Sequence, residues 1–580
     1  MIMNGAEILI DALKKEGVNT IFGYPGGVVI PIFDVLYSTP DIRFVLTRHE
    51  QGATHAADGY SRSTGKVGVC LVTSGPGATN TITGIATAKL DSSPLVVISG
   101  QVHTSNIGSD AFQETDMIGL TRSICKHNYL VKDVHDLAKT IKEAFYIAKS
   151  GRPGPVSIDL PVNVQNAKVK NYTYPETIDL PGYKPVLEGN TLQIEKLARA
   201  IEQAKKPLLY TGGGIIAANA TDSLLALLDK TQIPIVVTLM GLGSVPYDHP
   251  CYLGMPGMHG TIAANKALME CDLLIAVGVR FDDRVTGPPH LFANQATIAH
   301  IDIDPAEIGK NVKTHLPVVG DAKYVLEELY RHVKPRLPDA WNERTTYWKK
   351  QYPLTYRKSK DGLISPQSVI DKLNDFVGPE TLVVTDVGQH QMWAAMYYHH
   401  QKPRHFLSSG GLGTMGFGLP AAIGASIGNP QKPVVCISGD GSIQMNIQEL
   451  ATCSINHLPI KILIINNTYL GMVRQWQDLF WNKKYSQVCL KQGPTCPPDC
   501  TGDPKTCPFE YIPDFVKVAE AYNIKGLRAS TPEEVIPVLK EGIETQGPVL
   551  MEFMVSREEN VFPMVSAGKP LSDIMTGDKP

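Results

Sequence analysis

Two buried-strand patterns, each followed by a polar cluster, constrain this chain more than any other feature. Residues 433–437 lead into Gly-Asp-Gly-Ser at 439–442, and residues 460–465 lead into an Asn-Asn pair. A stretch with helical spacing separates the two patterns. The sequence therefore predicts a strand–helix–strand unit. Such a unit places Asp440 and Asn467 together at the carboxyl ends of neighbouring parallel strands, where open α/β sheets bind ligands.

The side chains of this pair suit a divalent metal. Asp440 offers a carboxylate and Asn467 an amide oxygen, and Mg²⁺ combines such hard ligands with phosphate oxygens and water. Gly441 and Ser442 are expected to open a helix whose free N–H groups favour an anion. A Gly-Asp-Gly turn alone is often only a tight turn. The flanking strands favour a clamp for a metal and a diphosphate.

Composition describes an ordinary soluble protein. The chain has 580 residues, of which 43% are hydrophobic and 19% charged, and its net charge is -3. This length predicts about three domains. The charge gives no reason to expect binding to nucleic acid, and no apolar run is long enough to predict a membrane span. Without a recognisable signal peptide, and with Cys70, Cys271 and Cys436 inside apolar strand patterns, we expect a cytoplasmic protein with reduced thiols.

Short apolar runs alternate with helical patterns along the whole chain, which predicts α/β domains with doubly wound parallel sheets. The runs lie at 67–72, 95–99, 208–210, 235–237, 273–277 and 382–384, in addition to the two above. Polar, proline-containing stretches at 166–192 and 335–365 are interpreted as linkers. The predicted units are 1–165, 190–335, 365–550 and a C-terminal segment, 551–580. At the N-terminus, Asn4 is predicted to cap a helix that stops at Gly17.

The first and third domains show a faint internal echo. Residues 66–77 resemble residues 432–441, and each segment follows a helix rich in alanine and glycine. Strand–turn–helix units look alike by chance, so this similarity is weak on its own. It suggests two related domains, of which only the third carries the metal aspartate.

The Gly-Asp-Gly…Asn-Asn pattern resembles the signature of thiamine diphosphate-dependent enzymes. The resemblance implies that Asp440, Asn467 and the backbone carbonyl of Tyr469 bind Mg²⁺. It also implies a pyrimidine-binding first domain and a diphosphate-binding third domain of similar fold. In this family the cofactor supplies the electron sink, and the protein supplies orientation and proton handling.

Two further residues fit the cofactor's needs. A carboxyl group must contact the far pyrimidine nitrogen, and Glu50, between a strand pattern and a small-residue helix, is the candidate. A glutamate at a helix start is otherwise often only a first-turn carboxylate favoured by the helix dipole. A bulky apolar side chain must also bend the cofactor, and Met415 stands in the glycine-rich stretch 410–418.

Longer strings resemble the catalytic large subunits of acetolactate synthase over nearly the whole chain. They are 24–27 (YPGG), 48–53, 74–80 (SGPGATN), 112–114, 151–155 (GRPGP), 280–287 (RFDDRVTG), 388–393, 471–477 (GMVRQWQ) and 560–565. This resemblance implies a thiamine diphosphate site formed by Tyr24, Pro25, Gly26, Glu50, Pro76, Asn80, Val387, Gly388, Gln389, His390, Gly413, Met415, Gly439, Gly441, Ser442, Gly471 and Met472.

The resemblance also implies a central FAD-binding domain in which the flavin is structural. The residues expected to line it are Arg152, Gly212, Gly213, Gly214, Thr238, Leu239, Met258, His259, Gly278, Arg280, Asp282, Arg284, Asp302, Ile303, Asp321 and Ala322. From the residues alone, only the triple-glycine turn and the strand ending at Asp302 suggest a nucleotide. An arginine in an Asp-Asp-Arg string, such as Arg284, can equally belong to a surface ion-pair cluster.

The implied activity is that of acetolactate synthase. Pyruvate is decarboxylated and its hydroxyethyl unit joins a second pyruvate, giving 2-acetolactate, or 2-ketobutyrate, giving 2-aceto-2-hydroxybutyrate. These steps begin branched-chain amino acid synthesis. Gln113 would bind substrate oxygens, Met472 and Trp476 would line the acceptor pocket, and Arg284 would face the acceptor carboxylate. The family implies a homodimer or homotetramer with sites at the subunit interface and a regulatory small subunit.

Two alternative functions stay open from the sequence. One is another thiamine diphosphate enzyme, either a simple 2-keto acid decarboxylase or a different carboligase. The other is a non-catalytic flavoprotein or regulatory relative, which the joint presence of Glu50, Asp440 and Asn467 disfavours. The family's usual lysine is Val162 here and its usual alanine is Val28, which puts the steering of substrate carboxylates and the shape of the cofactor wall in question.

Four crowded cysteines are a further oddity of the third domain. They are Cys489, Cys496, Cys500 and Cys507. Their spacing differs from the tight pairs of zinc sites. A thiol-bearing loop, redox-labile disulfides and a four-thiolate metal site are the alternatives.

Overall fold

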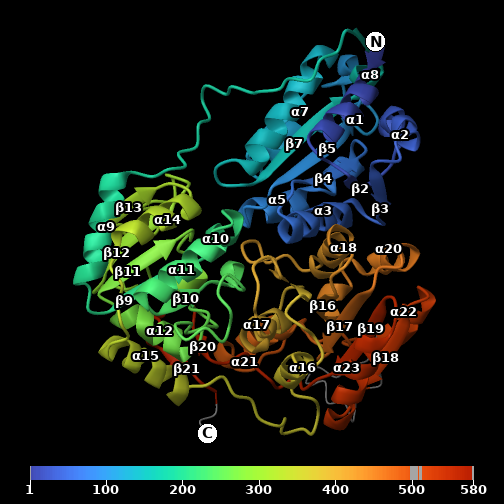
Figure 1. Ribbon diagram of the computed structural model, residues 1–580. Coiled ribbons are helices and arrows are strands. Elements are labelled where there is room, and N and C mark those ends of the chain that lie inside the picture. The colour runs from blue at the N-terminus through green and yellow to red at the C-terminus, as the bar shows by residue number, and fades with distance from the viewer. Residues whose placement is uncertain (1, 495, 497–506, 508–512, 578–580) are drawn as a thin grey trace.

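A computed structural model describes residues 2–494, 496, 507 and 513–577. They fold into three α/β domains, drawn in blue, green and orange to red in Figure 1. Each domain is built on one parallel sheet with helices packed against it, which confirms the predicted fold class. No helix among these residues is both long and apolar enough to cross a membrane.

The N-terminal domain has a six-stranded parallel sheet with the order β3-β2-β4-β5-β7-β6. Its strands are β2 (Thr20–Tyr24), β3 (Arg43–Leu46), β4 (Gly68–Val72), β5 (Leu95–Gln101), β6 (His127–Leu130) and β7 (Pro155–Pro161). Its helices are α1 (Gly5–Lys15), α2 (Ile30–Tyr37), α3 (Glu50–Thr64), α4 (Pro76–Thr79), α5 (Ile82–Leu90), α6 (Met117–Thr121), α7 (Val134–Lys149) and α8 (Val162–Asn166), with 3-10 turns η1 (Gly27–Val29) and η2 (Thr104–Asn106). A short antiparallel pair, β1 (Ile2–Asn4) and β8 (Lys168–Lys170), joins the two ends of the domain.

The middle domain has a five-stranded parallel sheet with the order β10-β9-β11-β12-β13. Its strands are β9 (Pro207–Thr211), β10 (Ile235–Val237), β11 (Leu273–Val277), β12 (Thr297–Asp302) and β13 (Leu316–Val319). Its helices are α9 (Thr191–Gln203), α10 (Gly213–Ala217), α11 (Thr221–Thr231), α12 (Ile262–Glu270), α13 (Asp283–Thr286), α14 (Ala322–His332) and α15 (Ala340–Gln351), with the 3-10 turn η3 (Leu239–Gly241).

The C-terminal domain has a six-stranded parallel sheet with the order β15-β14-β16-β17-β19-β18. Its strands are β14 (Leu382–Thr385), β15 (Phe406–Leu407), β16 (Val434–Gly439), β17 (Ile460–Asn466), β18 (Lys525–Ala529) and β19 (Val549–Met554). Its helices are α16 (Pro366–Leu373), α17 (Gln389–Tyr397), α18 (Gly418–Gly428), α19 (Asp440–Ile443), α20 (Leu450–Ile455), α21 (Gly471–Phe480), α22 (Phe515–Ala521) and α23 (Val535–Glu544), with 3-10 turns η4 (Ile447–Glu449) and η5 (Pro532–Glu534).

The first and third domains share one topology. Numbered in chain order within each domain, the strands of both sheets run 2-1-3-4-6-5. In this order β4 corresponds to β16, the two strands that carry the sequence echo. The echo therefore reflects two domains with the same fold.

Side-chain chemistry at the first helix agrees with the sequence pattern. The Asn4 side chain accepts the Glu7 N–H, and the Glu7 carboxylate accepts the Asn4 N–H, which forms a capping box. The chain leaves the helix through Gly17, whose φ is +77°. Local signals alone set both ends of α1.

The structure differs from the predicted linker at 335–365, because α15 occupies its middle. Asp339 caps this helix with a capping box, and Trp341 and Trp348 are buried in the core of the middle domain. The prolines and charges on either side concealed this apolar face from the sequence reading. The boundary proposed at 550 likewise falls inside β19, the strand beside β17.

The C-terminal segment returns to the middle domain. It forms the antiparallel pair β20 (Met564–Val565) and β21 (Ile574–Met575). Val565 and Leu571 are buried in the core of the middle domain, and the Val565 N–H donates to the Met258 carbonyl. The segment thus ties the middle domain to the C-terminal domain.

The N- and C-terminal domains meet across α3 and α18, which lie beside each other (Figure 1). A side chain at Gly59 would lie 2.1 Å from the Ala421 carbonyl oxygen, and one at Gly424 would lie 1.8 Å from that of Ala56. Only glycine permits this approach. One apolar core runs through both helices and reaches both sheets.

Candidate active site

Asp440 and Asn467 lie together, as the strand–helix–strand pattern predicts. Asp440 follows β16, Asn467 follows β17, and the two strands are parallel neighbours. Both residues line a cavity of about 100 Å³. The predicted residues that line it are Val387, Gly388, Gln389, His390, Met415, Gly439, Asp440, Gly441, Ser442, Asn467, Tyr469, Gly471 and Met472.

Among the described residues, the Asp440 carboxylate forms no ion pair with a cationic side chain. Burial raises the pKa of this carboxyl to about 7, and the nearby Glu552 carboxylate raises it further, against backbone hydrogen bonds that lower it. A divalent ion would stabilise the ionised form. The residues therefore fit a metal site at this point.

Backbone and amide groups close the cavity around the pair. Asn467 donates from Nδ2 to Gln389 Oε1 (3.2 Å), and Gln389 donates from Nε2 to Gln475 Oε1 (2.9 Å). A side chain at Gly471 would lie 2.2 Å from Gln389 Oε1. The glycine lets the first turn of α21 reach this wall, where its free N–H groups can meet an anion.

His390 is a buried, neutral imidazole in the same wall. Burial lowers its pKa to about 3, and its Nε2 atom has no hydrogen-bond partner among the described residues. Gly388 and Gly439 face the ring, since a side chain at either would lie within 3 Å of it. An unpaired polar atom at this depth favours a ligand in the cavity.

A second predicted group gathers at the carboxyl edge of the N-terminal sheet. Asn80 donates from Nδ2 to Glu50 Oε2 (2.9 Å), and a side chain at Gly77 would lie 3.3 Å from Glu50 Oε1. Gln113, whose φ is +61°, packs against Gly75. Tyr24, Pro25 and Pro76 are exposed, and Gly26 packs against Thr73, the residue that also faces Gly77.

Glu449 fixes the start of the helix that carries Glu50. Its Oε1 atom accepts the backbone N–H groups of Arg48 (2.9 Å) and His49 (3.0 Å). Glu449 belongs to the C-terminal domain, so this contact crosses the domain boundary. Nevertheless, the described residues that line the Asp440 cavity all lie between 387 and 473. Within one chain, Glu50 is not part of that cavity's wall.

Every residue predicted for the flavin lines a second, larger cavity of about 830 Å³ between the domains. This volume suits a dinucleotide-sized ligand. Gly212 and Gly214 lie directly against Gly278, because a side chain at either would meet its backbone within 2.7 Å. The predicted flavin residues are spread along the middle domain, apart from Arg152 of the N-terminal domain, and the structure gathers all of them around one cavity. Gly413 lines this cavity too, and not the smaller one where it was predicted.

The arginines at the larger cavity, Arg152, Arg280 and Arg284, are already paired with carboxylates. Arg152 donates from Nη1 to Glu307 Oε1 (2.7 Å) and from Nε to Ser92 Oγ (2.9 Å). Arg284 donates to Asp283 (3.2 Å) and remains largely exposed. The alternative interpretation of Arg284, a surface ion pair, therefore describes one of its contacts. Its place in the cavity wall leaves it accessible to a ligand.

Met472 and Trp476 stand where the two cavities adjoin. Met472 lines both cavities, and Trp476, one turn later on α21, lines the larger one. The Trp476 ring packs against Phe480 at 5.3 Å between centroids. A molecule in this region would touch the contents of both cavities.

Known proteins that are similar to this chain support two cofactor-binding domains flanking a central domain. Models of the thiamine pyrophosphate enzymes match three segments: the N-terminal TPP binding domain at residues 3–120, the central domain at 194–329 and the C-terminal TPP binding domain at 386–553. The acetolactate synthase large subunit of Corynebacterium glutamicum is 47% identical over 99% of this chain and 90% of its own length. The acetolactate synthase of Mycobacterium leprae is 48% identical over the same shares, and the large subunit of Haemophilus influenzae is 44% identical over 99% and 98%.

The chain belongs to the acetolactate synthase large-subunit family. The resemblance found in the sequence is thereby confirmed, as is the enzyme class, a thiamine-dependent carboligase. These relatives disfavour both alternatives, which were another thiamine diphosphate enzyme (a simple 2-keto acid decarboxylase or a different carboligase) and a non-catalytic flavoprotein or regulatory relative.

Several residues that line the cavities were not predicted from the sequence. In the larger cavity they are Leu90, Asp91, Ser92, Tyr146, Pro185, Leu187, Met240, Met255, Glu307, Gln391 and Met392. Most lie outside any cofactor motif, and Pro185 and Leu187 belong to a predicted linker. Gln391 and Met392 stand inside the 388–393 string, which was not assigned to this cavity.

Two departures from the family pattern lie away from both cavities among the described residues. Val28 packs against Gly100 of β5, and Val162 is the first residue of α8. Of the four crowded cysteines, Cys500 lies outside the described residues, and Cys489 pairs with Tyr469 as an isolated bridge. A role for these cysteines stays a prediction.

Proposed function

We propose that the chain condenses two 2-keto acids after decarboxylating the first, which is pyruvate. Pyruvate as the acceptor gives 2-acetolactate, and 2-ketobutyrate gives 2-aceto-2-hydroxybutyrate. The observation that carries this proposal is the position of Met472, which lines both the Asp440 cavity and the cavity with Trp476. A reaction centre at Met472 would thus adjoin a separate acceptor space.

The Asp440 cavity is proposed to hold thiamine diphosphate through Mg²⁺. Support comes from the raised pKa of Asp440, the amide of Asn467, and the unpaired Nε2 atom of His390. Asp440, Asn467 and the Tyr469 carbonyl would bind the metal, and the first turn of α21 would meet the diphosphate. When bound, the cofactor supplies a nucleophilic carbon and an electron sink for decarboxylation.

Glu50 is proposed to handle the proton that this chemistry requires. Asn80 occupies its Oε2 atom, and no hydrogen bond to Oε1 is present among the described residues. Oε1 can therefore share a proton with the pyrimidine nitrogen. The Glu449 contacts to Arg48 and His49 keep the first turn of α3, and hence Glu50, in place.

Glu50 and Asp440 are proposed to meet across two copies of the chain. The Glu50 group lies at an open sheet edge with exposed Tyr24, Pro25 and Pro76, while the Asp440 cavity has walls from residues 387–473 alone. A second copy would add the missing wall to each. Closed twofold symmetry then gives two equal sites in a homodimer, or more in a homotetramer.

FAD is proposed to fill the larger cavity as a structural ligand. The triple-glycine turn would admit a diphosphate to close backbone approach, and Asp302 ends a strand at the cavity. No redox step in the proposed reaction needs a flavin. Its proposed contribution is to complete the wall that Arg152, Met258 and Arg284 form.

Substrate recognition is proposed to use Gln113, Arg284 and Trp476. A guanidinium binds carboxylates in a bidentate manner, and an indole wall favours a longer keto acid. A regulatory small subunit and a cytoplasmic location are also proposed. The small subunit is proposed because two of the relatives are called large subunits.

The test is a product assay on the purified chain. It is incubated with pyruvate, thiamine diphosphate, Mg²⁺ and FAD, and acetolactate and acetaldehyde are measured together. The proposal predicts acetolactate as the main product, and its loss in Glu50→Gln. Acetaldehyde as the sole product would contradict the assigned acceptor space.

A further inference from the structure

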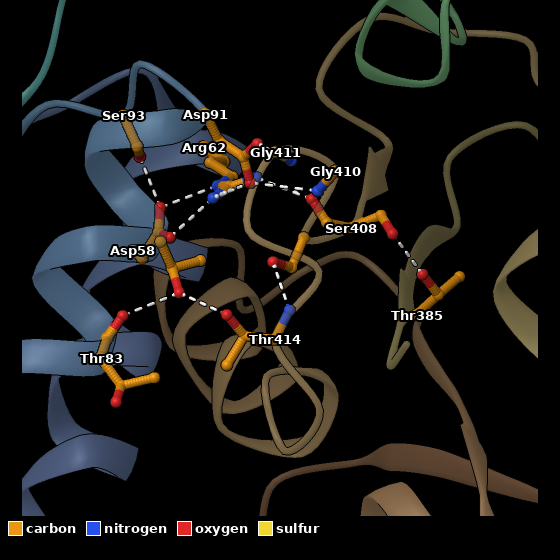
Figure 2. Close-up of polar contacts among 12 residues, drawn as sticks. Asp58, Arg62, Thr83, Asp91, Ser93, Thr385, Ser408, Gly410, Gly411 and Thr414 are labelled. Carbon is orange, nitrogen blue, oxygen red and sulfur yellow. Dashed lines mark hydrogen bonds and ion pairs between the residues drawn. The ribbon is translucent and has the colours of Figure 1, made fainter. Parts of the chain in front are cut away.

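A buried ion cluster joins the N-terminal domain to the glycine loop, defined as residues 408–416 (Figure 2). Arg62 of α3 donates from Nε and Nη2 to Asp58 (both 2.7 Å) and from Nη2 to Asp91 Oδ2 (2.9 Å). The side chains of both aspartates are fully buried. Ser93 completes the cluster by donating to Asp58 (2.5 Å).

Only one of the two aspartates reaches the glycine loop. Asp91 accepts the backbone N–H of Gly411 at Oδ1 (2.6 Å) and that of Gly410 at Oδ2 (3.2 Å). Asp58 is bonded to Arg62 and Ser93. The two carboxylates share one guanidinium, which itself donates from Nη1 to the Ser408 carbonyl (2.8 Å), but only Asp91 bonds to the loop directly. This difference makes them a matched pair.

The glycines at 410 and 411 are needed for this contact. A side chain at Gly410 would lie 2.4 Å from Met240 Sδ, and one at Gly411 would lie 2.8 Å from Leu90 Cβ and 2.9 Å from Asp91 Oδ1. Glycine therefore lets two successive N–H groups point at one carboxylate. A charge-assisted hydrogen bond is stronger than a neutral one, so Asp91 is a firm anchor.

Thr87 of α5 provides a second contact to the glycine loop. It lies one helical turn before Asp91, the residue that follows the helix. Its Oγ1 lies 2.7 Å from Thr414 Oγ1, and both residues are buried. Thr414 precedes Met415, and Gly416 donates its N–H to Asp386 Oδ1 (2.8 Å). Met415 is therefore held on one side by the N-terminal domain and on the other by the carboxyl end of β14.

The glycine loop separates the two cavities. Ser409, Gly410 and Gly413 line the larger cavity, and Met415 lines the Asp440 cavity. Asp91 also lines the larger cavity beside Ser92, which accepts from Arg152. The turn at the end of α5 thus touches the larger cavity and holds the loop that shapes the smaller one.

We propose that Asp91 is a positioning residue for the thiamine site. Through the N–H groups of Gly410 and Gly411, with Thr87 as a second contact, it fixes the loop that presents Met415 to the Asp440 cavity. This inference rests on the proposed function, in which Met415 borders the bound cofactor. It assigns a role in that function to a carboxylate that does not itself touch the reacting atoms.

The first test compares Asp91→Asn with Asp58→Asn in the full chain. Both variants remove one carboxylate from Arg62, which contacts Ser408 of the loop, and only the first also removes a direct bond to the loop. Hydrogen exchange of peptides that cover 408–416 is measured by mass spectrometry without cofactors. We expect exchange in the loop to be at least roughly tenfold faster in Asp91→Asn than in Asp58→Asn at equal thermal stability. Equal exchange in both variants would overturn the proposal.

The second readout is the binding of thiamine diphosphate with Mg²⁺, followed by protein fluorescence. We expect roughly tenfold weaker binding and a lower kcat for Asp91→Asn, with the KM for pyruvate less affected. Asp58→Asn should bind almost as the parent chain does. A parent chain that makes no acetolactate refutes the proposed function, whereas an active parent with equal behaviour of both variants refutes only this inference.

Thr87→Val and Thr87→Ser provide an independent pair should Asp91→Asn fail to fold. Valine keeps the shape of Thr87 without its hydroxyl, and serine keeps the hydroxyl. We expect Thr87→Val to loosen the loop and weaken cofactor binding, and Thr87→Ser to restore both. Unchanged loop exchange in Thr87→Val would contradict the proposal.

Discussion

The Asn80 amide donates a hydrogen bond to the Glu50 carboxylate at 2.9 Å, joining the turn after β4 to the start of α3. Asn80 lies after α4 in the SGPGATN string, and Glu50 is the first residue of its helix. The bond engages Glu50 Oε2, while Oε1 has no hydrogen bond among the described residues. It makes the orientation of the proposed proton carrier depend on a residue thirty positions away.

Asn80→Ala should therefore slow catalysis without unfolding the chain. Loss of a hydrogen bond to a charged group costs about 1.5–3 kcal/mol, so kcat should fall by roughly tenfold or more. Steady-state acetolactate formation measures this effect. Asn190→Ala, which removes the cap of α9 at a residue that lines neither cavity, is the control and should leave kcat unchanged. Equal rates for Asn80→Ala and the parent would remove Asn80 from the site.

Gly471→Ala should weaken the binding of Mg²⁺ and thiamine diphosphate. The added methyl group would lie 2.2 Å from Gln389 Oε1 and 2.6 Å from Asn467 Nδ2, so one wall must move. We expect the concentration of thiamine diphosphate for half-maximal activity to rise by roughly tenfold. Gly378→Ala meets open space and serves as the matched control. Normal cofactor affinity in Gly471→Ala would argue against this wall as the diphosphate site.

Four buried histidines should make the protein sensitive to acid. Burial lowers the pKa values of His55, His259 and His400 to about 4, and that of His390 to about 3. Each titrates near 6.5 in the unfolded chain, which therefore binds more protons between pH 6.5 and about 4. The destabilisation that comes from protonating these four histidines is absent above pH 6.5 and grows as the pH falls through this window.

His400→Gln should remove one of these protons while keeping a group that can bond to the Ala395 carbonyl. The pH dependence of its unfolding free energy should be shallower by up to ~1.4 kcal/mol per pH unit. Thermal melting of the parent and the variant between pH 4.5 and about 7.5 measures the difference. If the melting temperatures of the parent and the variant changed with pH in the same way, His400 would not take up a proton on unfolding.

Trp476→Leu should change the choice of acceptor. The indole lines the larger cavity next to Met472, and a smaller side chain removes contacts that a longer keto acid would use. In competition between pyruvate and 2-ketobutyrate, selectivity for 2-ketobutyrate should fall by roughly tenfold. Trp481→Leu, on the exposed end of the same helix, should leave the product ratio unchanged. If both variants kept the parent ratio, the acceptor space would lie elsewhere.

Local patterns were sufficient to predict the parts of the site that lie next to strands. Asp440 and Asn467 follow two apolar runs, so parallel pairing alone brings them together. The same reasoning found the cap at Asn4. It missed α15, because an amphipathic helix between prolines and charges reads as a linker until Trp341 and Trp348 are seen to share a core.

Contacts between distant elements could not be predicted in this way. Asp58 and Arg62 are one helical turn apart, but Asp91 joins them only through the packing of α3 against α5. Pro185 and Leu187 line the larger cavity from the segment that connects two domains. Such walls depend on how whole domains sit together, and no periodicity in the sequence encodes that.

The most direct test of the account is subunit complementation between Glu50→Gln and Asp440→Asn. The two variants are co-expressed with different tags, and assemblies that carry both tags are purified by successive affinity steps. If Glu50 of one copy acts with Asp440 of another, one site in each mixed dimer keeps both residues, and acetolactate formation should reach about half of the parent activity. If the mixed assemblies are as inactive as each variant alone, the site does not form between two copies, and the central claim is contradicted.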